Sequence, residues 1–320
     1  MFAAVSAAVY AQTQVSVYIR NPLSSDIKGM VSGGYWVGEI PITASGDCGS
    51  DQQTTAYCMN FDKTVYVGST YAAETAAVAD IAKWKAVSYL LTWYTPTAGD
   101  HEAAANQVAI WSILDNGYVK PSWLSTSINN AGLALASEVE SKDVVREGDM
   151  FQWIEPVTTN QSAVMGNPGE TITFKARLTD GSGTPRPNVK VLFTAVLRPD
   201  NVELGASYLN PVVTHTDDDG IAAVTVTVPD DIKNGESIEV KASTKSVWPQ
   251  LYLDLTDECR QDLIGMGTCF DLTVSTNVCV LASILVIPEV PLGTLTAGAA
   301  CALAFVFWKR GGRLKTPKLS

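Results

Sequence analysis

One glutamine in this sequence occupies a position at which its side chain needs an explanation. Gln107 lies in a segment with helical periodicity, on the apolar face of the expected helix. That face also carries Ala103, Ile110, Trp111 and Leu114. A buried amide needs hydrogen-bond partners at both of its ends, so glutamine is unusual there. Either neighbouring backbone groups bind the amide, or the side chain has been converted and is no longer an amide.

Three short motifs in the same region resemble the thioester domains of surface adhesins. They are the triplet Tyr57-Cys58-Met59, the segment 88–91 (SYLL) and the segment 107–111 (QVAIW). The cysteine and the glutamine are about fifty residues apart, which is compatible with that family. The family usually has threonine before the glutamine, where this chain has Asn106.

The resemblance implies a specific reaction between Cys58 and Gln107. In this family the thiol attacks the side-chain carbonyl of the glutamine, ammonia leaves, and an internal thioester remains. Cys58 would supply the sulfur and Gln107 the acyl group. The thioester is an electrophile, held in an apolar pocket until an amine or hydroxyl on a target reaches it. We therefore expect an adhesin that bonds to a nucleophile on another surface, with no catalytic residues, no metal and no cofactor.

Three other interpretations of Cys58 stay open. Cys48 lies ten residues earlier, and a disulfide between the two cysteines would remove the nucleophile. Cys58 could also be a free buried cysteine. As the nucleophile of an enzyme it would need a base and an orienting third group. Only His101 and His215 exist as histidine bases, one expected at the start of a helix and the other in a different domain, so the sequence disfavours enzymatic turnover.

The region 12–155 combines strand and helix signals, and we expect it to form a mixed α/β head. Apolar residues recur with helical spacing over 75–94, where Pro96 stops the helix. A second helix is expected from Asp100, its cap, to Leu114.

The region 156–245 has the pattern of a β-sandwich, because short alternating segments are separated by turn signals. The segments 169–172, 187–191 and 216–222 resemble the bacterial-type immunoglobulin-like domains of surface stalks. The three acids at 217–219 suggest calcium at first sight. Acids before a turn glycine are usually a solvated hairpin, so we expect no metal there.

The segment 246–285 is expected to be a neck that contains Cys259, Cys269 and Cys279. Structural zinc sites favour cysteines roughly two to four residues apart, so a disulfide between two of these three fits the spacing better than metal ligation. Before the sandwich, the sequon at Asn160 is expected to be exposed and glycosylated.

The C-terminal end combines an apolar span with a basic tail. Residues 292–308 carry no charge, and with the apolar residues before them they can cross a hydrocarbon core of about 30 Å. A buried core helix is the alternative. Lys309 and Arg310 follow at once, which predicts a transmembrane helix with the tail in the cytoplasm and the body of the chain outside the cell. The start of the chain, 1–11, has the features of a partial signal peptide.

The residues before the apolar span resemble a sorting signal. Pro288, Glu289 and Pro291 precede the span, as in the tripartite signals processed by archaeosortases and exosortases. The nearest variety carries Pro-Glu-Phe, and here Val290 replaces the phenylalanine. The resemblance implies removal of the span by a sortase-like enzyme and an archaeal source. The alternative is an ordinary transmembrane helix.

The charge distribution disfavours nucleic acid as a partner. The net charge is −11, and five cations lie in the last twelve residues, so the rest of the chain has 17 Lys and Arg against 33 Asp and Glu. An acidic body repels phosphate backbones. The main alternative to a covalent adhesin is a structural envelope or stalk protein with no covalent chemistry.

These features predict a multidomain, membrane-anchored cell-surface protein. Its parts are a mixed α/β thioester-type head, an all-β immunoglobulin-like sandwich and a C-terminal transmembrane helix. The predicted order is a partial signal peptide (1–11), the head (12–155), the immunoglobulin-like domain (156–245), the cysteine-bearing neck (246–285), the sorting motif with the span (286–308) and a basic cytoplasmic tail (309–320).

Overall fold

A computed structural model of the chain describes residues 14–282 with several short gaps. The residues left out within that range are 23–27, 33, 46–51, 61, 62, 64, 78–81, 95–98, 116, 157–162, 234, 256–261 and 266–270. The chain divides into two units, Met1–Ala282 and Ser283–Ser320, and the second lies outside the described residues. The predicted signal peptide, sorting motif (Pro288, Glu289, Pro291), apolar span and basic tail lie outside them, as do Cys48, Asn160, Cys259 and Cys269.

Strands dominate the described chain, which contains eighteen strands and three helices. The longest helix, α2 (Asp100–Leu114), has 15 residues and ends where the sequence predicted, but its N-cap is Gly99 and not the predicted Asp100. No helix among the described residues is long and apolar enough to cross a membrane. The described fold is mostly β, so the expected fold class with a mixed α/β head is wrong, while the predicted span at 292–308 lies outside the described residues.

The first helix, predicted over 75–94, is shorter in the structure. Part of 75–94 belongs to strand β6 (Thr70–Ala77), and helix α1 (Ala82–Trp93) begins only after it. The alanines of β6 favour a helix intrinsically. Pairing with two distant strands overrides that preference, because strand formation depends on neighbours that lie far away in sequence.

Six strands close into a barrel. In order around it they are β1 (Gln14–Ile19), β4 (Ile40–Ser45), β5 (Gln52–Cys58), β17 (Leu263–Gly265), β16 (Gln250–Asp254) and β6. All neighbouring strands are antiparallel. Alternate residues of β1, namely Val15, Val17 and Ile19, are buried inside with Ile42 and Leu263. The interior is thus a packed core.

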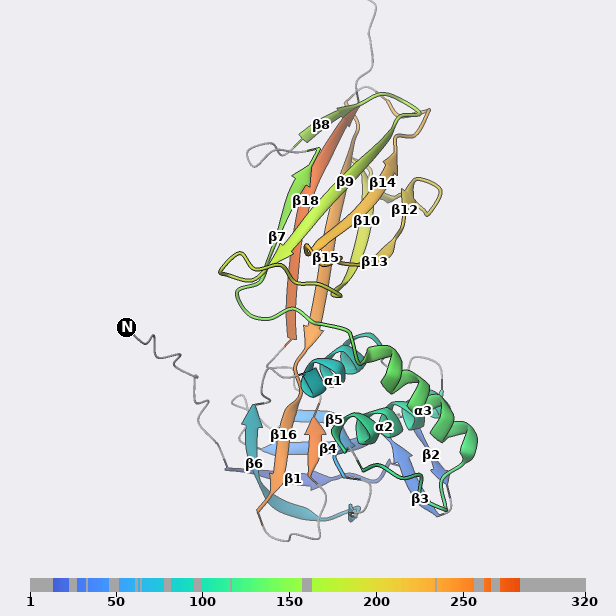
Figure 1. Cartoon of the computed structure of the whole chain (residues 1–320), viewed down its shortest axis with the longest axis vertical. Helices are drawn as coiled ribbons and strands as arrows, with labels where there is room; N and C mark the ends of the chain where they lie inside the picture. The colour runs from blue at the N-terminus through green and yellow to red at the C-terminus, as the bar shows by residue number, and fades with distance from the viewer. Residues whose placement is uncertain are drawn as a thin grey trace, which may run out of the picture. The chain divides into compact units, whose positions relative to one another are not determined.

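The three helices pack beside the barrel (Figure 1). Val87 and Leu90 of α1 and Ile110 of α2 share a core with Tyr57 and Ile264 of the barrel strands. The third helix, α3 (Thr126–Val139), runs along α2. The hairpin of β2 (Gly29–Ser32) and β3 (Tyr35–Gly38) also contacts α2 and completes the surroundings of this helix.

Two further sheets share a separate core and form a sandwich (Figure 1). One contains, in order, β11 (Val202–Glu203), β10 (Lys190–Arg198), β15 (Ser237–Val247), β18 (Asp271–Ala282) and β8 (Ala163–Gly166), and β13 (Val213–His215) also pairs with β10. The other contains β12 (Leu209–Asn210), β14 (Ile221–Thr227), β9 (Thr171–Thr179) and β7 (Met150–Glu155). The resemblance to immunoglobulin-like domains stays a prediction.

The segment 246–285, predicted to be a neck, instead contributes strands to both bodies. Strand β16 pairs with β6 and β17 pairs with β5, which closes the barrel and leaves it without an exposed edge there. Strand β18 then pairs with β15 in the sandwich. Strand β7, placed in the head by the sequence, pairs with β9 of the sandwich. The chain therefore passes from barrel to sandwich, back to the barrel, and again to the sandwich.

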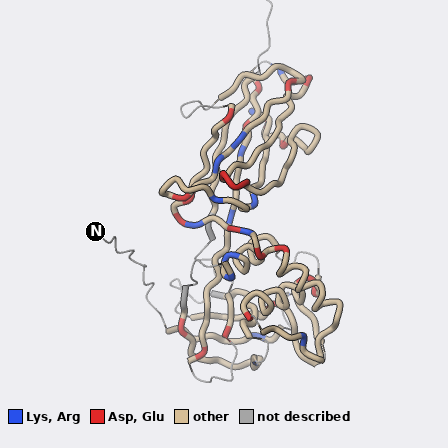
Figure 2. The backbone as a smooth tube through the Cα atoms, in the orientation of Figure 1, with Lys and Arg blue, Asp and Glu red and all other residues tan. Residues whose placement is uncertain are grey.

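Charged residues of both signs are interspersed along the described chain (Figure 2). In one ion pair the carboxylate is buried: Asp149, whose side chain is 1% exposed, accepts from Nε and Nη2 of Arg186 at 3.1 and 3.0 Å. Such two-pronged bonding fits the planar guanidinium. The Asp149–Arg186 ion pair joins the segment before β7 to the turn after β9.

Candidate functional site

Cys58 is the last residue of β5, at a point where the barrel lacks a backbone partner on one side. Leu263 of β17 lies opposite Cys58 on the other side. Strand β4 begins only at Ile40, which pairs with Ala56, so β4 offers no residue to Cys58. The chain before β4 turns away at Gly38, whose φ of +137° favours glycine. The N–H and C=O of Cys58 must find partners elsewhere.

The side-chain amide of Gln107 provides both partners. Its Oε1 accepts from the backbone N of Cys58 at 2.8 Å, and its Nε2 donates to the backbone O of Cys58 at 2.8 Å. Gln107 is 1% exposed. The amide thus takes the place of a neighbouring strand, and the structure brings together the two residues that the sequence singled out. These bonds also match the simpler of the two explanations for a buried glutamine, in which backbone groups satisfy its amide.

The thiol of Cys58 lies among apolar side chains. It packs against the barrel core and against a cluster formed by α2, α3 and the hairpin, which includes Val37 and Trp111. Burial raises the pKa of Cys58 to about 12. The thiol is therefore neutral at physiological pH, and it must lose its proton as it attacks. Cys58 is a free cysteine, while its rival partner, Cys48, lies outside the described residues.

A polar group that sequence reasoning missed lies beside this pair. Glu39 is 7% exposed, and its Oε2 accepts from the backbone N of Lys28 at 3.2 Å. Burial raises the pKa of Glu39. Burial and, next, the charge of Glu39 raise the pKa of Tyr57. The sequence signal was an acid between two buried apolar residues, Val37 and Ile40, where strand periodicity assigns no role to a carboxylate.

The remaining predicted site residues lie elsewhere. Cys279 is a free cysteine on β18. His215 hydrogen-bonds through Nε2 to the hydroxyl of Tyr89 at 2.8 Å, and His101 is exposed in the first turn of α2. Among the residues that the structure describes, no group of three or more His, Cys, Asp or Glu side chains could hold a metal ion.

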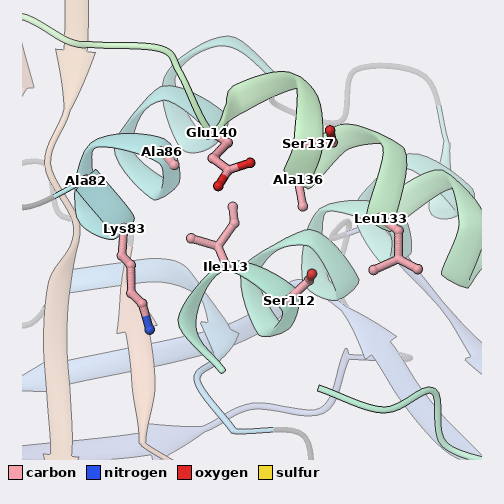
Figure 3. Close-up of a pocket in the computed structure, with 9 residues that line it drawn as sticks. All are labelled: Ala82, Lys83, Ala86, Ser112, Ile113, Leu133, Ala136, Ser137 and Glu140. Atoms are coloured by element: carbon pink, nitrogen blue, oxygen red, sulfur yellow. The ribbon is translucent and has the colours of Figure 1, made fainter. Parts of the chain in front are cut away.

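A pocket of about 340 Å³ lies between α1, α2 and α3 (Figure 3), and neither Cys58 nor Gln107 lines it. Its lining residues are Ala82, Lys83, Ala86, Ser112, Ile113, Leu133, Ala136, Ser137 and Glu140. Lys83 is already engaged, since its Nζ donates to the carbonyl of Leu114 at the end of α2 at 3.0 Å. The lysine in the pocket lining is therefore not a free cation.

Comparisons with known proteins yield structural similarities of low score. No protein-family model matches the chain, and no curated protein matches it. The structure is similar to the thioester domain of the Enterococcus faecium TIE86 protein, with a TM-score of 0.33, 12% identity, and coverage of 86% of this chain and 95% of that one. For the Bacillus anthracis TIE protein the TM-score is 0.34 and the identity 13%, with 85% and 49% covered, so the match spans about half of that protein. Because both TM-scores lie below 0.5, we base the proposals below on the contacts of Cys58 and Gln107.

Proposed function

We propose that Cys58 and Gln107 form an internal thioester and that this protein is an adhesin that uses it to bond covalently to a target. The observation that supports the proposal is the pair of 2.8 Å hydrogen bonds between the Gln107 amide and the Cys58 backbone. They hold the acyl group against the residue that carries the thiol. Proximity of this kind converts a bimolecular step into an intramolecular one.

The same contacts stabilise the negative charge that develops during thioester formation. As Sγ of Cys58 attacks Cδ of Gln107, negative charge grows on Oε1. The N–H of Cys58 already donates to that oxygen, so it acts as an oxyanion donor. The S–C bond forms, the C–N bond breaks, and the thiol proton leaves on ammonia.

In the reaction with a target, the sulfur of Cys58 is the leaving group, whereas it was the nucleophile during thioester formation. An amine on the target attacks the acyl carbon, a new amide forms, the S–C bond breaks, and the thiol of Cys58 recovers a proton. A hydroxyl group would give an ester by the same route. Each molecule reacts once, so we propose a covalent binder that requires no cofactor and no turnover, with a protein amine or a glycan hydroxyl as its partner.

Intact mass of the purified protein tests the proposal. The wild type should weigh one ammonia less than its sequence, and methylamine should add its own mass at Gln107. Cys58→Ala should abolish both changes, whereas Cys279→Ala, which removes the other free cysteine of the described chain, should leave both intact. An unmodified mass, or a Cys48–Cys58 peptide pair that disappears on reduction, would falsify the thioester.

The alternative function is that of a structural envelope or stalk protein. One observation favours it: both ends of the Gln107 amide are already satisfied by backbone groups, as an unreacted glutamine requires. In that case Gln107 only completes the hydrogen bonding of β5. The mass measurement separates the two functions directly.

We further propose that the protein acts at the cell surface and that Pro288, Glu289 and Pro291 form the recognition site of a sortase-like processing enzyme. The proline at each end of this motif favours extended backbone before it, which such an enzyme can bind. An epitope tag placed after Ser320 should disappear from the mature wild type in its native host. It should persist when the three residues are replaced together, and persistence in both would contradict processing.

A further inference from the structure

Two successive residues of β5 meet two successive residues of α2. Cys58 is bound by Gln107, as described above. The preceding pair, Tyr57 and Asn106, is also buried, at 1% and 3% exposed. Asn106 donates through Nδ2 to the carbonyl of Tyr94, and the pKa of Tyr57 responds to Asn106. Whatever holds Tyr57 and Asn106 therefore also sets where Gln107 sits against Cys58.

Glu39 lies next to this pair on the barrel. Strand β4 pairs with β5 so that Ile40 lies opposite Ala56. Continuing the antiparallel register by one residue brings Glu39 opposite Tyr57. Facing Glu39 are the ammonium-bearing Lys28 and the phenol of Tyr57, both of which affect its pKa. On the α2 side, Asp100 accepts from the backbone N of Gly29 at 3.2 Å, so this carboxylate is occupied by the hairpin.

A purely structural role does not require a carboxylate at position 39. Glu39 does tie the hairpin together, because its N–H donates to the carbonyl of Lys28 at 2.9 Å and its Oε2 accepts from the N–H of Lys28. A glutamine carbonyl would accept that N–H equally well. A buried acid is costly when it ionises, and a glutamine would avoid that cost, so these hydrogen bonds alone do not account for an acid at this position.

The hydroxyl of Tyr57 is a second feature of this region. It is buried without a well-formed hydrogen bond to a described group, although Glu39 and Asn106 lie near enough for hydrogen bonding with them to affect its pKa. A buried hydroxyl without a partner is rare in a folded protein. Hydrogen bonds around reacting groups are often long before reaction and tighten in the reacting complex.

We propose that Glu39 is a positioning residue for the acyl group, acting through Tyr57 and Asn106 on Gln107. When ionised, Glu39 accepts from the Tyr57 hydroxyl, whose oxygen then faces Asn106 and holds the Asn106–Gln107 turn of α2 against β5. When Glu39 is neutral, it no longer holds the Tyr57 hydroxyl in this position. The inference rests on the proposed thioester, and it assigns Glu39 to both the formation of the thioester and its reaction with amines.

The test compares Glu39→Gln with Glu74→Gln, which removes an acid from β6 of the same barrel. For each protein, the fraction with the ammonia-minus mass and the rate of methylamine incorporation are measured from pH 5 to pH 9. Comparison at equal pH cancels the ionisation of methylamine itself. We expect Glu39→Gln to react at least tenfold more slowly at pH 8 and to lack the rise with pH that ionisation of Glu39 adds in the wild type. Glu74→Gln should follow the wild type.

A second variant protects the test against misfolding. Tyr57→Phe removes only the hydroxyl and should reproduce the slower reaction. Wild-type rates and pH profiles in both variants would overturn the role of Glu39 while leaving the thioester in place. An unmodified wild-type mass would instead overturn the thioester, and the role of Glu39 with it.

Discussion

Gln107 completes the hydrogen bonding of a strand with a side chain, which is an unusual task for a glutamine. Because β4 starts at Ile40, the N–H and C=O of Cys58 depend on this one amide. We expect Gln107→Ala to lower the free energy of unfolding by about 1–3 kcal/mol, since it leaves two backbone groups without partners. Urea denaturation measures the change.

The control for this substitution is Gln152→Ala, at an exposed glutamine on β7. An exposed side chain away from special features usually contributes within about 0.5 kcal/mol. Equal losses in the two variants would mean that the Gln107 amide does not support β5.

Glu39 allows a prediction about pH and stability. Burial raises the pKa of Glu39 above its ordinary 4.5, so the folded state binds this proton more tightly than the unfolded state does. Its contribution to stability is therefore present at pH 4 and is lost as the pH rises through the folded-state pKa. Glu39→Gln should gain stability relative to the wild type between pH 4 and pH 7. Urea midpoints at the two pH values measure this, and a gain in the opposite direction would contradict it.

At the level of the elements, the hairpin β2–β3 decides where β4 can begin. A Cβ added at Gly38 would lie 2.5 Å from Cα of Gly29 and 2.8 Å from the carbonyl of Lys28, and the φ of Gly38 is +137°. Gly34 has a φ of +87°, but a Cβ there would meet no described atom within 4 Å. Gly34→Ala should cost about 1–2 kcal/mol for its backbone conformation alone. Gly38→Ala should cost clearly more, because its Cβ also strikes backbone.

Incorporation of methylamine at Gln107 gives a second readout for these two glycine variants. Displacing the hairpin at Gly38 should expose the apolar cluster around Cys58 and speed the reaction, whereas Gly34→Ala should react like the wild type. Similar rates in the two variants would show that the hairpin does not cover Cys58.

Much of the site could be predicted from local patterns, and the rest depended on distant neighbours. The helical spacing around Gln107 and the aromatic-Cys-aliphatic triplet at Cys58 are visible within short windows, and α2 ends at Leu114 as predicted. Glu39 was missed, because it lies between two strands, where no periodic pattern assigns a role to a single acid. Strands β16 and β17 were missed, because their partners lie about two hundred residues earlier in the chain.

At the scale of the whole molecule, the interleaved chain changes what can fold alone. The sandwich needs β7 and β18, which lie on either side of 156–245, the range that the sequence assigned to it. A fragment 156–245 would expose the edges of β9 and β15, which now pair with β7 and β18. We expect this fragment to aggregate or stay unfolded, while 14–282 folds. Circular dichroism and proton spectra test both, and a well-dispersed spectrum from the short fragment would contradict the expectation.

The passage of the chain through β17 into β18 has a mechanical consequence. Strand β17 lies beside Cys58, and only residues 266–270 separate it from β18. If the acyl group is held by a target while the chain is pulled at the end of β18, the load enters β18, which a ladder of eleven paired residues holds against β15. Pulling along the strand axis loads these hydrogen bonds in shear, so all of them resist together and none can be unzipped singly. The bond at Gln107 would then be carried by a tether built to bear tension.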